Sequence, residues 1–510
     1  MKKSLLLPLL LPLCMPMSAQ KNKKFESDLV SLRAYECPAW FQDAKFGIWA
    51  HWGPQSVPMQ GDWYARAMYE PDNNKRYKKD IYEYHIENYG HPSEFGYKDI
   101  IPLWKAEKFD PEALMKLYKK AGAKYFVSMG VHHDNFDLWD SKYNRWNAVD
   151  MGPKQDIVKA WSDAAKKEGL YFGVSEHLSA GYDWWQANKG ADKTGDKKGV
   201  PYDGANPKYW DLYYDLSASK GRSWTPNNGM FAQMWYARMM DLIENYEFDI
   251  LYTDGALPFG SYGEMMLANF YNKNIEDNRG DLEAVYLAKP GRHEKGWAIF
   301  DGETCVEDRE RGGLADISKT PWQTDTSIGD WFYNENYKAE DTGTMYRSPF
   351  WVISTLVDVV SKNGNMLLNV LQRPDGTVDN EVVELLTTVG EWLDCNGEAI
   401  YESRPWLVFG EGPQERDGHA DWKEDFEYTS QDIRYTRDQD NDFLYATVMG
   451  IPDKTIILKE VSKANREIKS ISLLGSKEDI AWQQTANGLE IQVPHFAENT
   501  LLPVFKIKWK

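Results

Sequence analysis

The chain has 510 residues, of which 27% are charged and 42% are hydrophobic. This length and composition are typical of a globular protein with a large core, which excludes disorder for most of the chain and allows two or three domains. The 78 acidic residues outnumber the 59 Lys and Arg, giving a net charge of -19. That charge provides no electrostatic surface for nucleic acid and disfavours adhesion to anionic lipid.

The first 20 residues have the pattern of a secretory signal peptide. Lys2 and Lys3 form a positively charged start, residues 5–17 form an apolar stretch, and Ser18-Ala19-Gln20 offers a small-residue cleavage site. The apolar stretch is too short for a membrane span, and no later stretch is long and apolar enough for one. We therefore expect a secreted protein, located in a bacterial periplasm and cleaved near Ala19-Gln20, with a lipid anchor on Cys14 as the less favoured alternative.

Cysteines are too few for a disulfide-based fold. Cys37, Cys305 and Cys395 remain after cleavage, and their wide separation leaves room for one bridge at most. No paired cysteines or Cys/His cluster points to a structural zinc site.

The body of the chain alternates between strands and helices. Short apolar segments predict strands at residues 45–51, 124–132, 170–176 and 248–254. Amphipathic segments predict helices at residues 110–121, 156–167 and 230–246. Such alternation indicates a parallel sheet, either doubly wound or closed into a barrel. The first strand is not followed by a Gly-x-Gly-x-x-Gly motif, and polar side chains end all four strands, so we predict a (β/α)8-like, TIM-type barrel over residues 21–400.

The second half of this barrel is less regular in sequence. Residues 297–300 and 365–370 are strand candidates, residues 381–395 a helix, and residues 301–312 a charged loop. After residue 400, short alternating segments appear without intervening helices, at residues 443–448, 455–458, 468–473 and 489–493. They predict a C-terminal antiparallel β-sandwich over residues 401–510.

Several polar residues at strand ends could carry chemistry. Asp254 ends its strand before Gly255 and could be a nucleophile, a metal ligand or a turn residue. His132 and His133 are adjacent, so on a continuing strand only one would enter a shared site and the other would be structural. His51 precedes Trp52, and a hydrogen-bonding group beside a flat apolar ring suits a sugar.

Two mechanisms fit these residues. A metal-dependent hydrolase would use Asp254 with His51, His177 and either His132 or His133, but the His-x-His pair usual on the first strand of such barrels is absent. A glycosidase needs two carboxylates, about 5–5.5 Å apart for retention or about 6.5–9.5 Å for inversion. Asp254 would be the first carboxylate. The second could be Glu303, Glu307 or Glu310, although solvated loop residues are the alternative for most of them.

Longer motifs resemble the α-L-fucosidases of glycoside hydrolase family 29. The resemblance begins with KFGIWAHWGPQSVP at residues 45–58 and HHDNFDLWDS at residues 132–141. It continues in order through the motifs GDWYAR at 61–66, WNAVD at 146–150, GPKQDIV at 152–158, DILYTDG at 249–255, WQTDTSIG at 322–329, SKNGN at 361–365 and GEAIY at 397–401. It covers roughly residues 30 to 406, and the family also carries a C-terminal sandwich.

The resemblance implies an exo-acting enzyme that releases L-fucose from fucosylated glycans with retention and needs no metal or other cofactor. Asp254 would be the nucleophile and Glu310 the acid/base, with Glu307 and Glu303 as the next choices. Gln323 follows Trp322, and an amide cannot transfer the proton. A relative that binds carbohydrate but has lost catalysis is therefore a further alternative.

The resemblance also implies a set of substrate-binding residues. These are His51, Trp63, Tyr64, His132, His133 and Tyr252. The family more often has Glu at the position of Asp62 and Trp at the position of Tyr252. It often has an Arg after the fifth barrel strand, for which Arg292 is a weak candidate.

Overall fold

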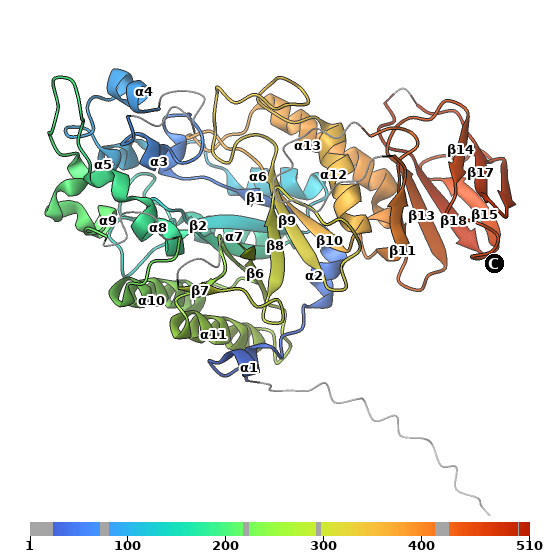
Figure 1. The fold of residues 1–510 in the computed structure, drawn as a ribbon, viewed down its shortest axis with the longest axis horizontal. Helices are drawn as coiled ribbons and strands as arrows, with labels where there is room; N and C mark the ends of the chain where they lie inside the picture. The colour runs from blue at the N-terminus through green and yellow to red at the C-terminus, as the bar shows by residue number, and fades with distance from the viewer. Residues whose placement is uncertain (1–23, 72–80, 218–223, 292–296, 414–427, 498) are drawn as a thin grey trace, which may run out of the picture.

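The computed structural model describes residues 24–71, 81–217, 224–291, 297–413, 428–497 and 499–510 (Figure 1). The predicted signal peptide and Arg292 lie outside these residues. Within them, no helix combines the length and the apolar character needed to cross a membrane. Cys37, Cys305 and Cys395 are all free thiols.

A closed barrel of eight parallel strands forms the larger part of the molecule (Figure 1). The strands follow the order β1-β10-β9-β8-β6-β4-β3-β2 around the barrel, and β1 closes it by pairing with both β2 and β10. Their bounds are Phe46–Ala50 (β1), Tyr125–Val131 (β2), Tyr171–Glu176 (β3), Ile250–Thr253 (β4), Val285–Ala288 (β6), Val306–Glu310 (β8), Trp322–Ser327 (β9) and Gly364–Asn369 (β10). The predicted barrel is confirmed.

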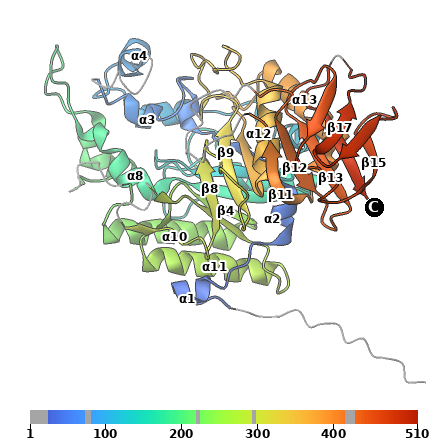
Figure 2. The same ribbon diagram turned by 45° about the vertical axis from the view of Figure 1, so that its right-hand side comes forward.

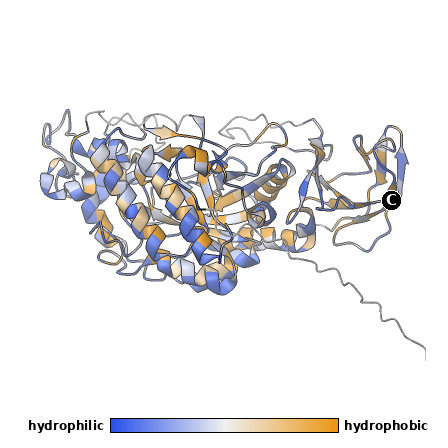
Figure 3. Ribbon diagram, turned by 90° about the horizontal axis from the view of Figure 1, so that it is seen from below, coloured by the Kyte–Doolittle hydropathy of each residue, from blue (hydrophilic) through white to orange (hydrophobic). Residues whose placement is uncertain are grey.

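Long helices cover much of the barrel. They are Pro111–Lys120 (α6), Ile157–Glu168 (α7), Gly229–Asn245 (α10), Ser261–Asp277 (α11), Pro349–Ser361 (α12) and Asn380–Asn396 (α13). The Asp110 side chain caps α6 by accepting a hydrogen bond from the Ala113 backbone N–H. Gly169 ends α7 at a φ of 71°, where glycine avoids the cost of a left-handed backbone. Figure 3, seen from the side of α10 and α11, shows hydrophilic residues along their outward faces.

The sequence misses part of the second half of the barrel. Residues 301–312, expected as a loop, contain the barrel strand β8. Val306 is its one apolar residue, so the strand lacks the hydrophobic signal that marks its neighbours. Asp308 faces Gln323 in the lumen, accepting a hydrogen bond at 2.8 Å, whereas Glu307 pairs with Arg309 at 2.5 Å. Alternation between two polar faces explains how so charged a segment forms a barrel strand.

The strand predicted at residues 297–300 forms outside the barrel. There Ala298–Ile299 (β7) pairs with Leu257–Pro258 (β5) in a separate two-stranded sheet. From residue 297 to residue 348, the chain contains no helix. No helix therefore crosses between β8 and β9, and α12, the helix that follows β9, packs against β10.

Several of the short helices gather on one side of the barrel, although others lie elsewhere. Figure 2 shows α3, α4 and α8 together there, within the long connections that follow β1 and β3. The short elements are Leu29–Leu32 (α1), Ala39–Ala44 (α2), Pro54–Ser56 (η1), Tyr64–Ala67 (α3), Ile81–Asn88 (α4), Tyr97–Ile100 (α5), Ile101–Leu103 (η2), Leu178–Trp184 (α8), Gln186–Lys189 (η3), Asp203–Ala205 (η4), Pro207–Tyr209 (η5), Trp210–Tyr213 (α9) and Gly397–Ala399 (η7).

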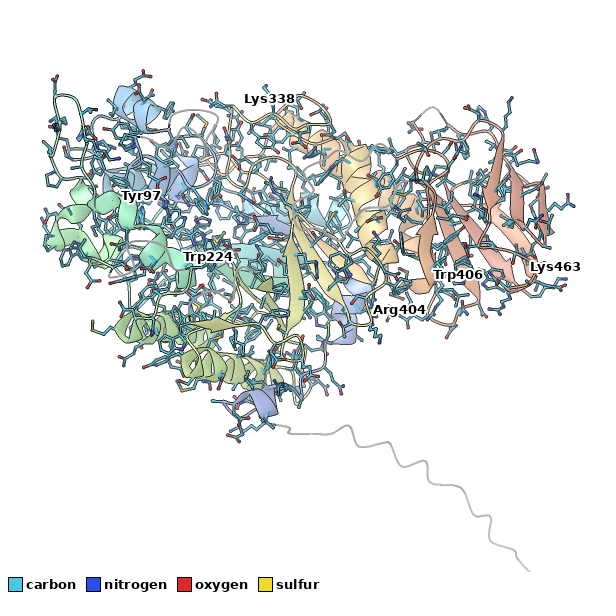
Figure 4. All side chains as sticks on the ribbon, viewed as in Figure 1. Tyr97, Trp224, Lys338, Arg404, Trp406 and Lys463 are labelled. Atoms are coloured by element: carbon cyan, nitrogen blue, oxygen red, sulfur yellow. The ribbon has the colours of Figure 1, made fainter. Side chains whose placement is uncertain are left out.

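The C-terminal region forms two antiparallel sheets, as predicted. One has the order β11-β12-β13-β18-β15 and the other β14-β17-β16. Their strands are Arg404–Glu411 (β11), Ile433–Arg437 (β12), Phe443–Val448 (β13), Thr455–Leu458 (β14), Ile468–Leu473 (β15), Trp482–Thr485 (β16), Gly488–Gln492 (β17) and Val504–Trp509 (β18). Figure 4 shows Arg404 and Trp406 on β11, the strand of the C-terminal sheets that lies beside the barrel. A buried network joins the two parts: Asp358 on α12 binds Lys362 at 3.0 Å and Arg434 on β12 at 2.7 Å.

Candidate active site

Asp254 lies at the carboxyl end of β4, where barrel enzymes hold their reacting groups. Its side chain is 11% exposed, and its Oδ1 accepts a hydrogen bond from Lys289 at 2.7 Å. The indole N–H of Trp224 donates to the Asp254 backbone carbonyl at 2.9 Å. Figure 4 places Trp224 beside the barrel, on the side of α8. Asp254 is therefore held through both its carboxylate and its backbone.

Lys289 connects Asp254 to two further carboxylates. Its Nζ lies 3.3 Å from Glu310 Oε2 and 3.3 Å from Asp325 Oδ2, and its side chain is 4% exposed. Burial disfavours the charge on Lys289, but the three carboxylates raise its pKa well above the ordinary value. Burial likewise works against the charge on Asp254, but Lys289 and His177 hold the pKa of Asp254 well below its ordinary value. Asp254 is therefore an ionised carboxylate at neutral pH.

The sequence analysis missed Lys289. It follows β6, the fifth strand of the barrel along the chain, and occupies the place for which Arg292 was considered. The signal was present, because an apolar run of four residues ends directly before this lysine. Strand β6 was not predicted, so Lys289 after it was not recognised as the cation that contacts the three carboxylates.

The three candidate acid/base residues occupy different environments. Glu310 ends β8 and contacts Lys289 beside Asp254. Glu307 pairs instead with Arg309. The side chain of Glu303 is 75% exposed and lies 3.6 Å from Arg33. Of the three, only Glu310 contacts Lys289, the residue that also contacts Asp254.

Gln323 is part of the barrel interior. Its amide donates to Asp308 at 2.8 Å and accepts from the Tyr125 hydroxyl at 2.9 Å. Burial, followed by the neighbouring Asp325, raises the pKa of Asp308 well above its ordinary value. Gln323 thus satisfies buried polar groups within the lumen, which accounts for an amide at this position.

Four histidine rings gather around Asp254. His133 Nε2 and His177 Nδ1 lie 3.5 Å and 3.4 Å from its Oδ2. The rings of His132 and His133 are 4.5 Å apart, and those of His51 and His177 are 5.3 Å apart. The expectation that one of His132 and His133 is only structural is not met, because β2 ends at Val131 and both rings turn into the site.

Hydrogen bonds fix the orientation of these rings. His51 Nδ1 lies 3.2 Å from Asn369 Oδ1, His132 Nδ1 lies 2.8 Å from the Gln55 amide, and His133 Nδ1 donates to the His177 carbonyl at 2.6 Å. Burial lowers the pKa of His51 to about 3 and, with neighbouring histidines, lowers that of His132 well below its ordinary value. Neutral imidazoles of this kind can hydrogen-bond the hydroxyls of a sugar.

Two groups of these buried side chains could hold a metal ion. One is His51, His132 and His177, and the other is His133, His177 and Asp254; in each, the donor atoms lie within 4.8 Å of one another. These are the residues that the metal-hydrolase alternative would use.

Aromatic rings complete the site. Trp63 lies edge-on to His133 at 6.0 Å, and Tyr252 lies 4.7 Å from Trp49 and donates to Asp325 at 3.1 Å. Tyr64 lies outside this group: it is fully buried, with its hydroxyl 2.7 Å from His85 Nδ1. A role for Tyr64 in substrate binding remains a prediction.

Further rings in the site were not predicted. Trp184 lies 5.0 Å from the His133 ring and Trp331 lies 5.0 Å from the His51 ring. Trp224 lies 5.2 Å from the His133 ring. They come from long connections, where no periodicity marks a residue as facing the site.

Several known proteins are similar to this chain in sequence and in fold. The family model for α-L-fucosidase matches residues 13–398, and that for the α-L-fucosidase C-terminal domain matches residues 426–508. Tissue α-L-fucosidase of Mus musculus is 28% identical over 94% of this chain and 93% of its own, and plasma α-L-fucosidase of Homo sapiens is 28% identical over 93% and 90%. The crystal structure of Thermotoga maritima α-fucosidase is 27% identical, with a TM-score of 0.70 over 95% of this chain and 100% of that one. The chain belongs to the α-L-fucosidase family and is a glycoside hydrolase.

Proposed function

We propose that this protein is an exported, exo-acting α-L-fucosidase that releases L-fucose from the non-reducing ends of fucosylated glycans with retention. The observation that carries retention is the shared contact with Lys289. Asp254 Oδ1 and Glu310 Oε2 lie 2.7 Å and 3.3 Å from the same nitrogen, so they are at most about 6 Å apart, near the ~5–5.5 Å of retaining pairs and short of the ~6.5–9.5 Å of inverting ones.

The proposed reaction proceeds in two displacements. Asp254 attacks the anomeric carbon while Glu310 gives its proton to the departing glycosidic oxygen, leaving a fucosyl ester on Asp254 and an ionised Glu310. Glu310 then takes a proton from water as the water oxygen attacks the anomeric carbon. The ester bond breaks, and Asp254 returns as a carboxylate. The low pKa of Asp254 keeps it ionised for the first step.

Burial of the site supports exo-action on a small deoxysugar. His132 and His177 are at most 4% exposed, which favours a substrate that enters the site by a single terminal sugar. Trp63 and Trp184, with ring centroids 5.4 Å apart, offer apolar surface to a methyl group in place of a hydroxyl. One solved structure of the Thermotoga maritima relative is a complex with fucose. Export is proposed from the sequence pattern of residues 1–20 alone.

The test is the mass of the intact protein after incubation with a 2-deoxy-2-fluoro-α-L-fucosyl donor that carries a good leaving group. The fluorine slows both steps and the leaving group speeds the first, so the ester accumulates. We expect one fluorofucosyl adduct on the wild type and none on Asp254→Ala. Saturable fucose binding without an adduct would favour a binding protein, and hydrolysis abolished by a chelator would favour the metal-dependent mechanism.

The acid/base assignment has its own test. Glu310→Ala should lower kcat about 10²–10⁴-fold on a substrate with a poor leaving group and much less on an activated aryl fucoside, which departs without a proton. Glu307→Ala, on the same strand but paired with Arg309, is the matched control and should stay near wild type on both substrates. The reverse pattern would assign the role to Glu307.

A further inference from the structure

Two imidazole nitrogens converge on the carboxylate of the nucleophile. The Nδ1–H of His133 donates to the His177 carbonyl, and the Nε2 of His133 lies 3.5 Å from Asp254 Oδ2. His177 Nδ1 lies 3.4 Å from the same oxygen, and neither ring nitrogen of His177 has a hydrogen-bond partner among the described residues. Buried polar atoms need a partner, and a cation between the two rings and the carboxylate would provide one for His177.

The spacing of these atoms matches a tetrahedral metal site. Zinc bonds to imidazole nitrogen and carboxylate oxygen are ~2.0–2.2 Å long, which places neighbouring ligand atoms of a tetrahedron about 3.3–3.5 Å apart. The two nitrogen-to-oxygen distances fall at this value, and the three donor atoms lie within 4.8 Å of one another. The bond from His133 Nδ1–H to a backbone carbonyl is also the usual outer-shell contact of a metal-bound histidine.

We propose that His133 Nε2, His177 Nδ1 and Asp254 Oδ2 form an inhibitory binding site for a transition-metal ion of the Zn²⁺ class, with the fourth position open to water. An ion bound there occupies the nucleophile, so metal and sugar exclude each other. The mixed nitrogen and oxygen ligands favour Zn²⁺ over Mg²⁺ or Ca²⁺, which prefer oxygen alone. Exclusion of the sugar rests on the proposed function, whereas binding of the metal does not.

One feature of the site bears on its affinity. Lys289, which contacts the other oxygen of Asp254 at 2.7 Å, repels a cation and limits the affinity. The second group, of His51, His132 and His177, contains no anion, and its His51 and His132 rings already contact Asn369 and Gln55.

The experiment titrates Zn²⁺ into tag-free, chelator-treated protein by calorimetry, with Co²⁺ as a spectroscopic probe. We expect one site, the strong visible absorption of tetrahedral Co²⁺, and a Kd that rises with added L-fucose. His133→Gln and Asp254→Asn should each weaken Zn²⁺ binding by at least about tenfold. His495→Gln, which removes an exposed histidine of the C-terminal region, is the matched control and should bind as wild type.

Several results would overturn the proposal. These are no Zn²⁺ binding, weak octahedral Co²⁺ absorption, an unchanged Kd in Asp254→Asn, or loss of binding in His51→Gln with Asp254→Asn unaffected. Circular dichroism confirms that each variant is folded. If Zn²⁺ binds as expected but no fluorofucosyl adduct forms, the proposed function fails while the metal site stands.

Discussion

At the scale of single residues, Lys289 organises the site. It is a buried ammonium within 3.3 Å of the Asp254, Glu310 and Asp325 carboxylates. Without this charge, burial would raise the pKa of Asp254 and favour its protonated form, which is not a nucleophile. One cation therefore keeps the nucleophile ionised and holds the second carboxylate beside it.

Replacing this charge should change the pH dependence of activity. In Lys289→Met the pKa of Asp254 rises, so the acidic limb of the kcat/KM profile should move to higher pH and activity at acid pH should fall. Lys289→Arg keeps the charge and should keep the limb. The measurement is kcat/KM against pH for the three proteins. Superimposed acidic limbs in the wild type and a folded Met variant would show that Lys289 does not set the pKa of Asp254.

Some residues of this site could be predicted from the sequence and others could not. Asp254 and His133 could be found because each follows an apolar strand. Trp224 could not, because its contact with the Asp254 carbonyl depends on where a long connection folds back. Residues brought in by such connections leave no periodic signal in the chain.

At the scale of elements, the apolar strands of the barrel were predicted from the sequence, whereas a highly charged strand was not. Strands β1 to β4 are mostly apolar, are buried except at Tyr171, and each coincide with a predicted segment. Strand β8 carries four charged residues out of five and was expected as a loop. Its strand conformation depends on partners in β6 and β9, which local sequence does not contain.

The contact between α12 and β12 shows how a buried charge network joins two elements. Asp358, Lys362 and Arg434 are each at most 1% exposed through their side chains. Asp358 carries the one carboxylate of these three groups and contacts both cations. Removing it would take a negative charge away from two buried cations at the junction.

Asp358→Asn should lower the free energy of unfolding by about 3–5 kcal/mol, because two buried cations would lose the carboxylate that contacts both of them. Lys506→Met is the matched control: it breaks the ion pair with Glu398 across the same junction, where the side chains are 24% and 41% exposed. That pair should contribute only ~0–1 kcal/mol. Urea unfolding measures both, and equal losses in the two variants would refute the difference between buried and exposed pairs.

At the scale of the whole molecule, the barrel and the sandwich share one apolar core. Tyr445, Leu502 and Val504 from the C-terminal region belong to the same buried cluster as Leu385 and Leu393 on α13. The other face of the sandwich sheets forms a second, separate core. The two parts are therefore packed together more like layers of one body than like linked domains.

This packing predicts cooperative unfolding. Calorimetry should give a single transition, and L-fucose, which on the proposed function binds only in the barrel, should raise the temperature of the whole transition. Two transitions, of which fucose shifts only one, would mean that barrel and sandwich unfold independently. Far-ultraviolet circular dichroism, recorded with and without fucose, provides a second probe.

The polar strand β8 also bears on how the barrel closes during folding. It has one apolar residue, and no helix lies between residues 297 and 348 to pack it against its neighbours. The strand is held by backbone pairing with β6 and β9 and by side-chain contacts between these neighbouring strands: Glu310 on β8 and Asp325 on β9 contact Lys289 after β6, and Asp308 contacts Gln323. The charged side chains that surround Asp254 are thus also the ones that contact one another where β6, β8 and β9 meet. Mutation at these positions therefore acts on assembly and on catalysis together.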